Sequence, residues 1–68
     1  MNKYLVSIYY FYDYYHTYYY YVVAKSPKQA EFFIRNYFGY KRVGVREIRV
    51  VCSVEDKSLL GTIEESLI

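Results

Sequence analysis

The chain has little of what most small metal-binding or catalytic domains depend on. Among its 68 residues there is one cysteine, one histidine, one proline and no tryptophan. A single cysteine excludes an internal disulfide framework. Cys52 and His16 together also fall short of the roughly four ligands of a structural zinc site. We therefore expect neither a metal nor a cofactor.

Long apolar runs are also missing. No stretch approaches the roughly 20 apolar residues that cross a bilayer. The tyrosine-rich beginning of the chain lacks the small-residue cleavage site of a signal peptide. We expect a cytoplasmic protein with no membrane partner.

Tyrosine, in contrast, is abundant, and nine of the twelve tyrosines fall within residues 9–23. A tyrosine combines a large apolar ring with a polar tip, which suits a half-buried sheet or an interface better than a dry core. A chain this short buries only roughly 60% of its unfolded surface. We therefore expect dimerisation or partner binding to add to its stability.

Charge divides the chain into two parts. Residues 1–54 carry eight basic residues against three acidic ones, a net +5, whereas residues 55–68 carry four acidic residues against one basic, a net −3. We interpret 1–54 as the folded domain and 55–68 as an acidic tail or short helix docked on it. Thr62 and Glu65 have the spacing of a helix cap. A disordered tail and a partner-binding motif both stay open.

Local patterns predict four elements in residues 3–54. Residues 3–12 and 16–24 are rich in aromatic and β-branched residues and favour two strands of an antiparallel hairpin linked by residues 13–15. Ser26, Pro27 and Gln29 form the start signal of a helix, and Gly39 supplies its stop. Apolar residues then alternate through 45–54, which predicts a third strand.

This order predicts an α+β fold, β-β-α-β, with a three-stranded antiparallel sheet in the order 2-1-3 and the helix on one face. The residues expected beneath the helix are Val6, Ile8, Val22, Ile48, Val50 and Cys52, against Ala30, Phe33, Ile34 and Tyr37.

The other face of this sheet would stay uncovered. It is expected to show Leu5, Tyr9, Phe11, Tyr19, Tyr21, Val23, Arg49 and Val51. Such an apolar patch is larger than a monomer usually exposes. A second copy, the tail or a foreign partner would have to cover it, and the sequence leaves all three open.

No catalytic arrangement emerges from the sequence. His16 with Asp13 and either Ser7 or Ser26 imitates a triad, but no nucleophile elbow accompanies them. Residues 39–44 imitate a phosphate loop without the Lys-Ser/Thr pair that should follow the second glycine. Cys52 is expected to act as a small hydrophobe on the inward side of its strand. We predict that the protein is not an enzyme.

Two binding functions remain. Tyrosine and arginine are enriched at protein interfaces. The first prediction is a protein-binding module that uses Tyr9, Phe11, Tyr19, Tyr21 and Arg49, and that also forms a homodimer. The alternative is a nucleic-acid-binding or ribosome-associated protein, because aromatic sheets rimmed by cations stack bases. Its expected residues are Tyr40, Lys41, Arg42 and Arg46.

The segment Val22-Val23-Ala24-Lys25-Ser26-Pro27-Lys28-Gln29-Ala30, with the aromatic helix and the strand that follow, resembles small strand-strand-helix-strand accessory proteins of phages and mobile elements of the DpnD/PcfM type. The similarity covers roughly residues 3–54. More distantly, the element order is similar to that of archaeal ribosomal protein LX. No functional residue carries over. The first resemblance implies an anti-defence context: binding and inhibition of a host protein, such as a defence nuclease, in the host cytoplasm.

Overall fold

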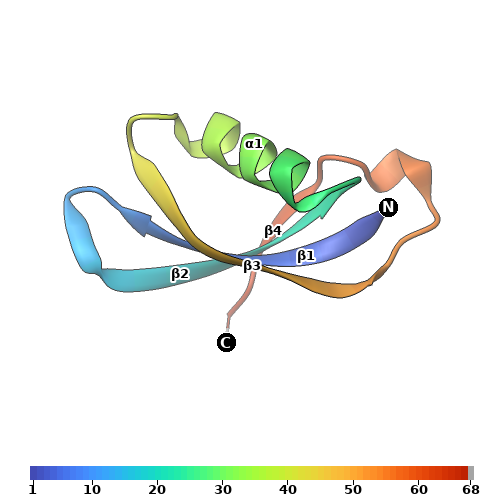
Figure 1. Ribbon diagram of the computed structural model, residues 1–68, viewed down its shortest axis with the longest axis horizontal. Helices are drawn as coiled ribbons and strands as arrows, with labels where there is room; N and C mark the ends of the chain where they lie inside the picture. Colours follow the sequence, from blue (N-terminus) through green and yellow to red (C-terminus); the bar gives the residue numbers. More distant parts are fainter. Residues whose placement is uncertain (68) are drawn as a thin grey trace.

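One helix lies across one face of a curved antiparallel sheet in the computed structural model, which describes residues 1–67 (Figure 1). The elements are β1 (Asn2–Tyr10), β2 (Asp13–Ala24), α1 (Pro27–Phe38), β3 (Val43–Ser53), the 3-10 helix η1 (Lys57–Leu59) and β4 (Ile63–Glu65). The sheet order is β3-β1-β2-β4. The predicted α+β class and the central position of the first strand are confirmed, but the described sheet has four strands and not three.

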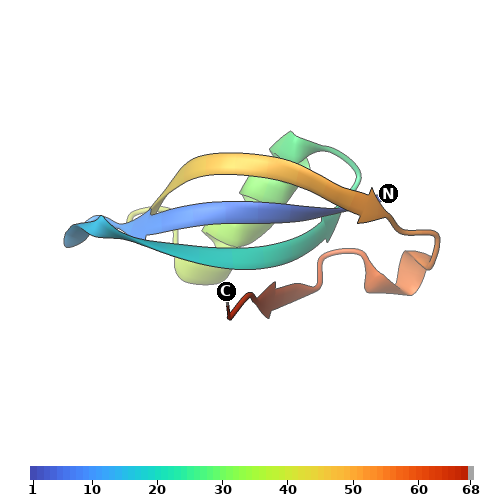
Figure 2. The same cartoon turned by 90° about the horizontal axis from the view of Figure 1, so that it is seen from below.

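The fourth strand comes from the acidic tail. β4 pairs antiparallel with β2, with Ile63 opposite Val22 and Glu65 opposite Tyr20. The expected short helix starting at Thr62 is therefore wrong, and the tail's helical turn is η1 instead. Pairing gives partners to backbone groups along the outer edge of β2 that would otherwise depend on water. Because these residues join the sheet edge (Figure 2), the tail does not fold across the middle of the uncovered face.

The helix begins and ends where the sequence predicts. The Ser26 side chain accepts a hydrogen bond from the Gln29 amide at 3.1 Å, and the Gln29 side chain accepts one from the Lys25 amide at 2.7 Å. Gly39 has φ of 99° and its amide donates to the Arg35 carbonyl at 2.8 Å. A residue with a side chain adopts this φ at a cost, so the glycine sets the end of α1.

The hairpin turns earlier than expected. Tyr10 lies opposite Asp13, so the turn consists of Phe11 and Tyr12 and not of residues 13–15. The register between β1 and β2 then shifts between Ile8 and Tyr10. The Phe11 amide donates to the Arg42 carbonyl at 3.0 Å. This contact ties the turn to the loop between α1 and β3, a non-local effect that turn propensities do not include.

The core lies between α1 and the two central strands. Val6, Ile8, Val22, Ala30 and Ile34 are fully buried there. β1 lies between β2 and β3, and its helix-side residues Tyr4, Val6 and Ile8 are buried, whereas Leu5 and Tyr9 on the opposite face are partly exposed.

Three residues expected beneath the helix are not covered by it. Val50 lies on the helix side of the sheet as predicted, opposite the buried Tyr4, but it is largely exposed. Tyr37 and Cys52 are exposed as well. The reason for Cys52 is a β-bulge: Tyr4 pairs with Val50 and Lys3 with Cys52, which leaves Val51 without an opposite residue. One extra residue reverses the alternation of the strand, so Cys52 lies on the side of Lys3. The Tyr37 ring packs edge-on against Phe38, at 4.8 Å between centroids.

Candidate binding surface on the open face of the sheet

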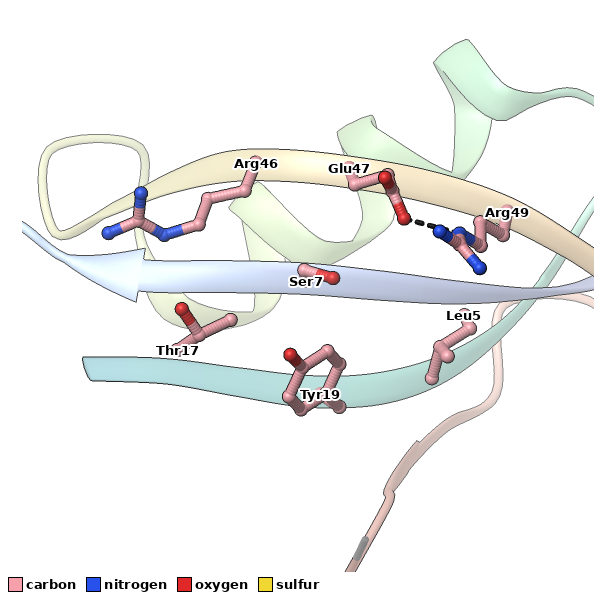
Figure 3. Close-up of a pocket in the computed structure, with 7 residues that line it drawn as sticks. All are labelled: Leu5, Ser7, Thr17, Tyr19, Arg46, Glu47 and Arg49. Carbon is pink, nitrogen blue, oxygen red and sulfur yellow. Dashed lines mark hydrogen bonds and ion pairs between the residues drawn. The ribbon is translucent and has the colours of Figure 1, made fainter. Parts of the chain in front are cut away.

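The sheet face opposite α1, here called the open face, carries a mixture of apolar, hydroxyl and charged side chains. Alternate residues of β1 and β2 point to it, and β3 adds a charged rim. A shallow depression of about 380 Å³ lies at its centre (Figure 3). The residues that line it are Leu5, Ser7, Thr17, Tyr19, Arg46, Glu47 and Arg49.

The cations of the open face are engaged with acceptors and rings. The guanidinium of Arg49 forms an ion pair with Glu47 on the same strand (Figure 3). Lys3 places its ammonium 5.2 Å from the centroid of the Tyr21 ring. Both positive and negative side chains therefore line the depression, so its electrostatic character is mixed and not uniformly positive.

Arg46 organises the aromatic end of this face. Its guanidinium carbon lies 4.5 Å from the centroid of Tyr9 and 4.6 Å from that of Tyr14, and its Nη2 donates to the Tyr14 carbonyl. The rings of Tyr9 and Tyr14 contact each other edge-on at 5.1 Å. A guanidinium held by two aromatic rings and a carbonyl has little freedom left, so this cluster is a preorganised contact surface.

Gly44 provides the space for the Tyr9 ring. The two residues are opposite each other in β1 and β3. A Cβ atom added at Gly44 would lie 2.6 Å from Cε1 of Tyr9, and closer still to Cζ and the hydroxyl. The ring of Tyr9 thus lies directly over the backbone of β3. A glycine at this position serves the close approach of a ring, since its own φ is not in the left-handed region.

The structure brings most of the residues predicted for partner binding to one face. Tyr9, Tyr19, Tyr21 and Arg49 belong to the open face. Phe11 lies in the hairpin turn, half exposed, and its ring reaches the Tyr9 ring at 5.8 Å. The prediction that Val23 is uncovered is wrong. Val23 is buried where its backbone pairs with Gly61 and Thr62 of the tail.

The four residues predicted for nucleic-acid binding are not brought together. Lys41 and Arg42 line a second depression, of about 320 Å³, with the hairpin residues Tyr10, Phe11 and Tyr12. Tyr40 lies instead beside α1, where its ring is 6.3 Å from that of Phe32. Arg46 belongs to the open face.

Sequence reasoning did not select Ser7, Thr17, Tyr14 or Glu47 as functional. For Ser7 and Thr17 a signal was present, because alternation places both on the same face as the selected tyrosines. Tyr14 had no such signal. It reaches Arg46 because a second bulge leaves Arg46 without an opposite residue between Val45 and Glu47, so that two consecutive side chains of β3 reach the open face.

The titratable residues show two clear shifts. Burial raises the pKa of Tyr20 to about 12, helped by the neighbouring Tyr10 hydroxyl and the Glu65 carboxylate. Hydrogen bonds from the Ser58 side chain and amide hold the pKa of Asp56 below its ordinary value. Both groups lie outside the open face. The two polar residues at the hairpin, His16 and Asp13, contact each other at 2.6 Å.

Residues 1–67 contain no group of three or more His, Cys, Asp or Glu side chains arranged to hold a metal ion. Within the same described part of the chain, α1 is too short and too polar to cross a bilayer, and no other helix qualifies. No known protein family, curated protein or solved structure matches the chain.

Proposed function

We propose that this protein is a noncatalytic binding module that recognises a protein partner through the open face of its sheet. The observation that carries the proposal is the central depression, where the ion pair of Glu47 and Arg49 lies beside hydroxyl groups and the exposed edge of Tyr19. Both signs of charge and both kinds of hydrogen-bonding group occur within one aromatic surface. Protein interfaces combine rings, arginine and polar groups in this way.

The mixture of charges favours a protein over a polyanion at this site. Nucleic-acid surfaces collect unpaired Lys and Arg, because affinity comes largely from phosphate neutralisation. On the open face, Glu47 offsets Arg49, and Arg46 is held against Tyr9 and Tyr14. A protein partner with its own paired charges and apolar groups is the better complement.

The resemblance to phage and mobile-element accessory proteins extends this proposal to a partner class and a place. We expect the partner to be a host protein, such as a defence nuclease, met in the host cytoplasm. A chain of this size would inhibit it by occupying its surface, with no chemistry of its own.

A matched pair of tyrosine variants tests the proposal. Tagged wild-type protein, Tyr19→Ser and Tyr37→Ser are used to capture partners from a nuclease-treated lysate, and the captured proteins are quantified by mass spectrometry. Tyr19 lies on the open face, whereas Tyr37 is an exposed tyrosine on α1. One stoichiometric protein that the wild type and Tyr37→Ser retain and Tyr19→Ser loses is the expected result. Equal retention by all three proteins contradicts the proposed site.

A second candidate function rests on the second depression. Tyr10, Phe11 and Tyr12 lie there with Lys41 and Arg42, and no acidic residue lines it. Exposed rings beside unopposed cations are the elements of a single-strand-binding surface.

This candidate predicts that the double variant Lys41→Ala/Arg42→Ala loses affinity for a labelled single-stranded oligonucleotide. It also predicts that wild-type affinity falls steeply as salt is added, because counterions are released on binding. A matched control is Lys25→Ala/Lys28→Ala, which removes two charges near the start of α1. Wild-type affinity that does not change with salt, or equal loss in both double variants, excludes the second depression as the site.

A further inference from the structure

The two edges of the sheet differ sharply. β4, at one edge, has three residues, of which Glu64 and Glu65 are exposed. β3, at the other edge, has eleven residues, and in the described part of the chain no strand pairs with its outer side (Figure 2). Short length and acidic side chains are ways of protecting an edge. β3 is long and has one acidic residue, Glu47, and its outer N–H and C=O groups are available for another strand.

The side chains of β3 give only part of the usual protection against pairing, because Arg46, Glu47 and Arg49 are its only charged residues. The strand contains neither proline nor lysine, and Val50 and Val51 are 61% and 49% exposed. Exposed rings lie in the helix layer beside it. Phe32 and Tyr40 line a depression with Arg35, whose guanidinium donates to the Val43 carbonyl of β3 at 3.0 Å. Apolar side chains are therefore exposed in both layers on this flank.

The two bulges define the part of β3 that is able to pair regularly. Arg46 and Val51 have no opposite residue in β1. Between them, residues 47–50 keep the regular alternation of a strand. Bulges bend a strand and interrupt its ladder. A partner strand would therefore pair with residues 47–50, and this segment would determine the register.

The charges of this segment are complementary to themselves. When two identical strands pair antiparallel about a two-fold axis normal to the sheet, an axis at Ile48 places Glu47 opposite Arg49 of the second copy, and Arg49 opposite its Glu47. Opposite charges directly across a ladder are favourable. Moving the axis by one residue, to Glu47 or to Arg49, instead places like charges opposite each other. Both side chains are more than half exposed; within one copy they pair with each other, and in the dimer each would also face the opposite charge of the second copy.

We propose that two copies of this chain pair antiparallel through β3, with Ile48 at the two-fold axis, to form one continuous eight-stranded sheet. The proposal goes beyond the proposed function and does not rest on it. The occupant of the free edge is a second copy because the edge matches its own charges, and because a chain of this size gains most from additional buried surface.

Charge reversals test the pairing without removing any apolar contact. In Glu47→Arg alone, each dimer places arginine opposite arginine twice, and in Arg49→Glu alone it places glutamate opposite glutamate twice. We expect each variant to raise the dimer dissociation constant by about tenfold or more, measured by sedimentation equilibrium. A mixture of the two variants regains both opposite-charge pairs. The 1:1 mixture is therefore expected to form a heterodimer with near wild-type affinity.

Glu64→Arg, a charge reversal on the β4 edge, is the control and is expected to leave the wild-type dimer unchanged. Circular dichroism establishes that each variant is folded. A wild-type protein that stays monomeric overturns the proposal. So does a dimer that Glu64→Arg weakens and the β3 variants do not, because that result places the interface at the other edge. Failure of the mixture to regain the dimer lost by each variant overturns the Ile48 register.

Discussion

The close approach of Tyr9 to Gly44 predicts that Gly44→Ala changes stability in opposite directions when the Tyr9 ring is present and when it is removed. Gly44 lies within β3 in an ordinary backbone conformation, so alanine fits there without backbone strain. In a strand interior, alanine in place of glycine is worth about 0.5–1 kcal/mol, because glycine loses more conformational freedom on folding. In isolation, Gly44→Ala should therefore stabilise the protein.

The ring of Tyr9 reverses that expectation. The new Cβ would lie 2.6 Å from Cε1 of Tyr9, whereas ordinary contact begins near 3.4 Å. The ring has to move away, and it gives up its stacking against Arg46 and its edge contact with Tyr14. Overpacking of this kind costs typically about 1–3 kcal/mol. Offset by the glycine contribution, the net expectation for Gly44→Ala is a loss of about 0–2.5 kcal/mol.

A double-mutant cycle separates the two effects. Urea denaturation of the wild type, Gly44→Ala, Tyr9→Ser and the double variant gives the four free energies of unfolding. With Tyr9→Ser as the background, the ring is gone and Gly44→Ala should be neutral or stabilising. The expected coupling between the two sites is about 1–3 kcal/mol. If Gly44→Ala stabilises the protein while Tyr9 is present, the ring does not lie over Gly44 and the reasoning fails.

Three further predictions concern the fold around the site. Ile34→Ala, at a fully buried position of α1, should lower the free energy of unfolding by about 2–5 kcal/mol in urea denaturation, and the exposed Asn36→Ala should be close to neutral. Truncation after Leu60 removes β4 and uncovers the edge of β2, so we expect a lower melting temperature and concentration-dependent aggregation; an unchanged melting temperature would contradict the pairing. The pKa of Tyr20 is raised from 10.0 to about 12, so its contribution to the free energy of unfolding is complete below pH 10.0 and is lost as the pH rises to about 12. Over this pH range, the free energy of unfolding of Tyr20→Phe should therefore fall less than that of the wild type.

The parts of the fold that the sequence predicts are those determined by local chemistry. Ser26, Pro27 and Gln29 act within one turn of the helix, and Gly39 ends it through its own φ, so both boundaries of α1 are readable. The central place of β1 follows from apolar residues on both of its faces. The fourth strand is not readable in this way. Its three residues, Ile-Glu-Glu, have neither the length nor the alternation of a strand, and they extend only because the edge of β2 is there to pair with them.

The candidate site likewise has a part that the sequence predicts and a part that it does not. Alternation alone places Leu5, Tyr9, Tyr19 and Tyr21 on one face, because it needs only the period of a strand. The contact of Arg46 with Tyr9 and Tyr14 depends on a bulge in β3 and an irregular register in β2. Bulges are set by how strands of unequal length fit against each other, which no local pattern records. The Cys52 prediction failed for the same reason.

The proposed edge pairing and the proposed open-face function affect each other through geometry. A two-fold axis normal to the sheet keeps both helices on one side and both open faces on the other. The dimer would therefore present two copies of the depression on a single surface.

Tyr19 lies two strands away from the free edge of β3, about 10 Å at the usual strand spacing. Substitution at Tyr19 should leave the dimer intact. Glu47 and Arg49 belong to both surfaces, so their reversal should weaken dimer and partner binding together. A partner with two sites would then gain from avidity.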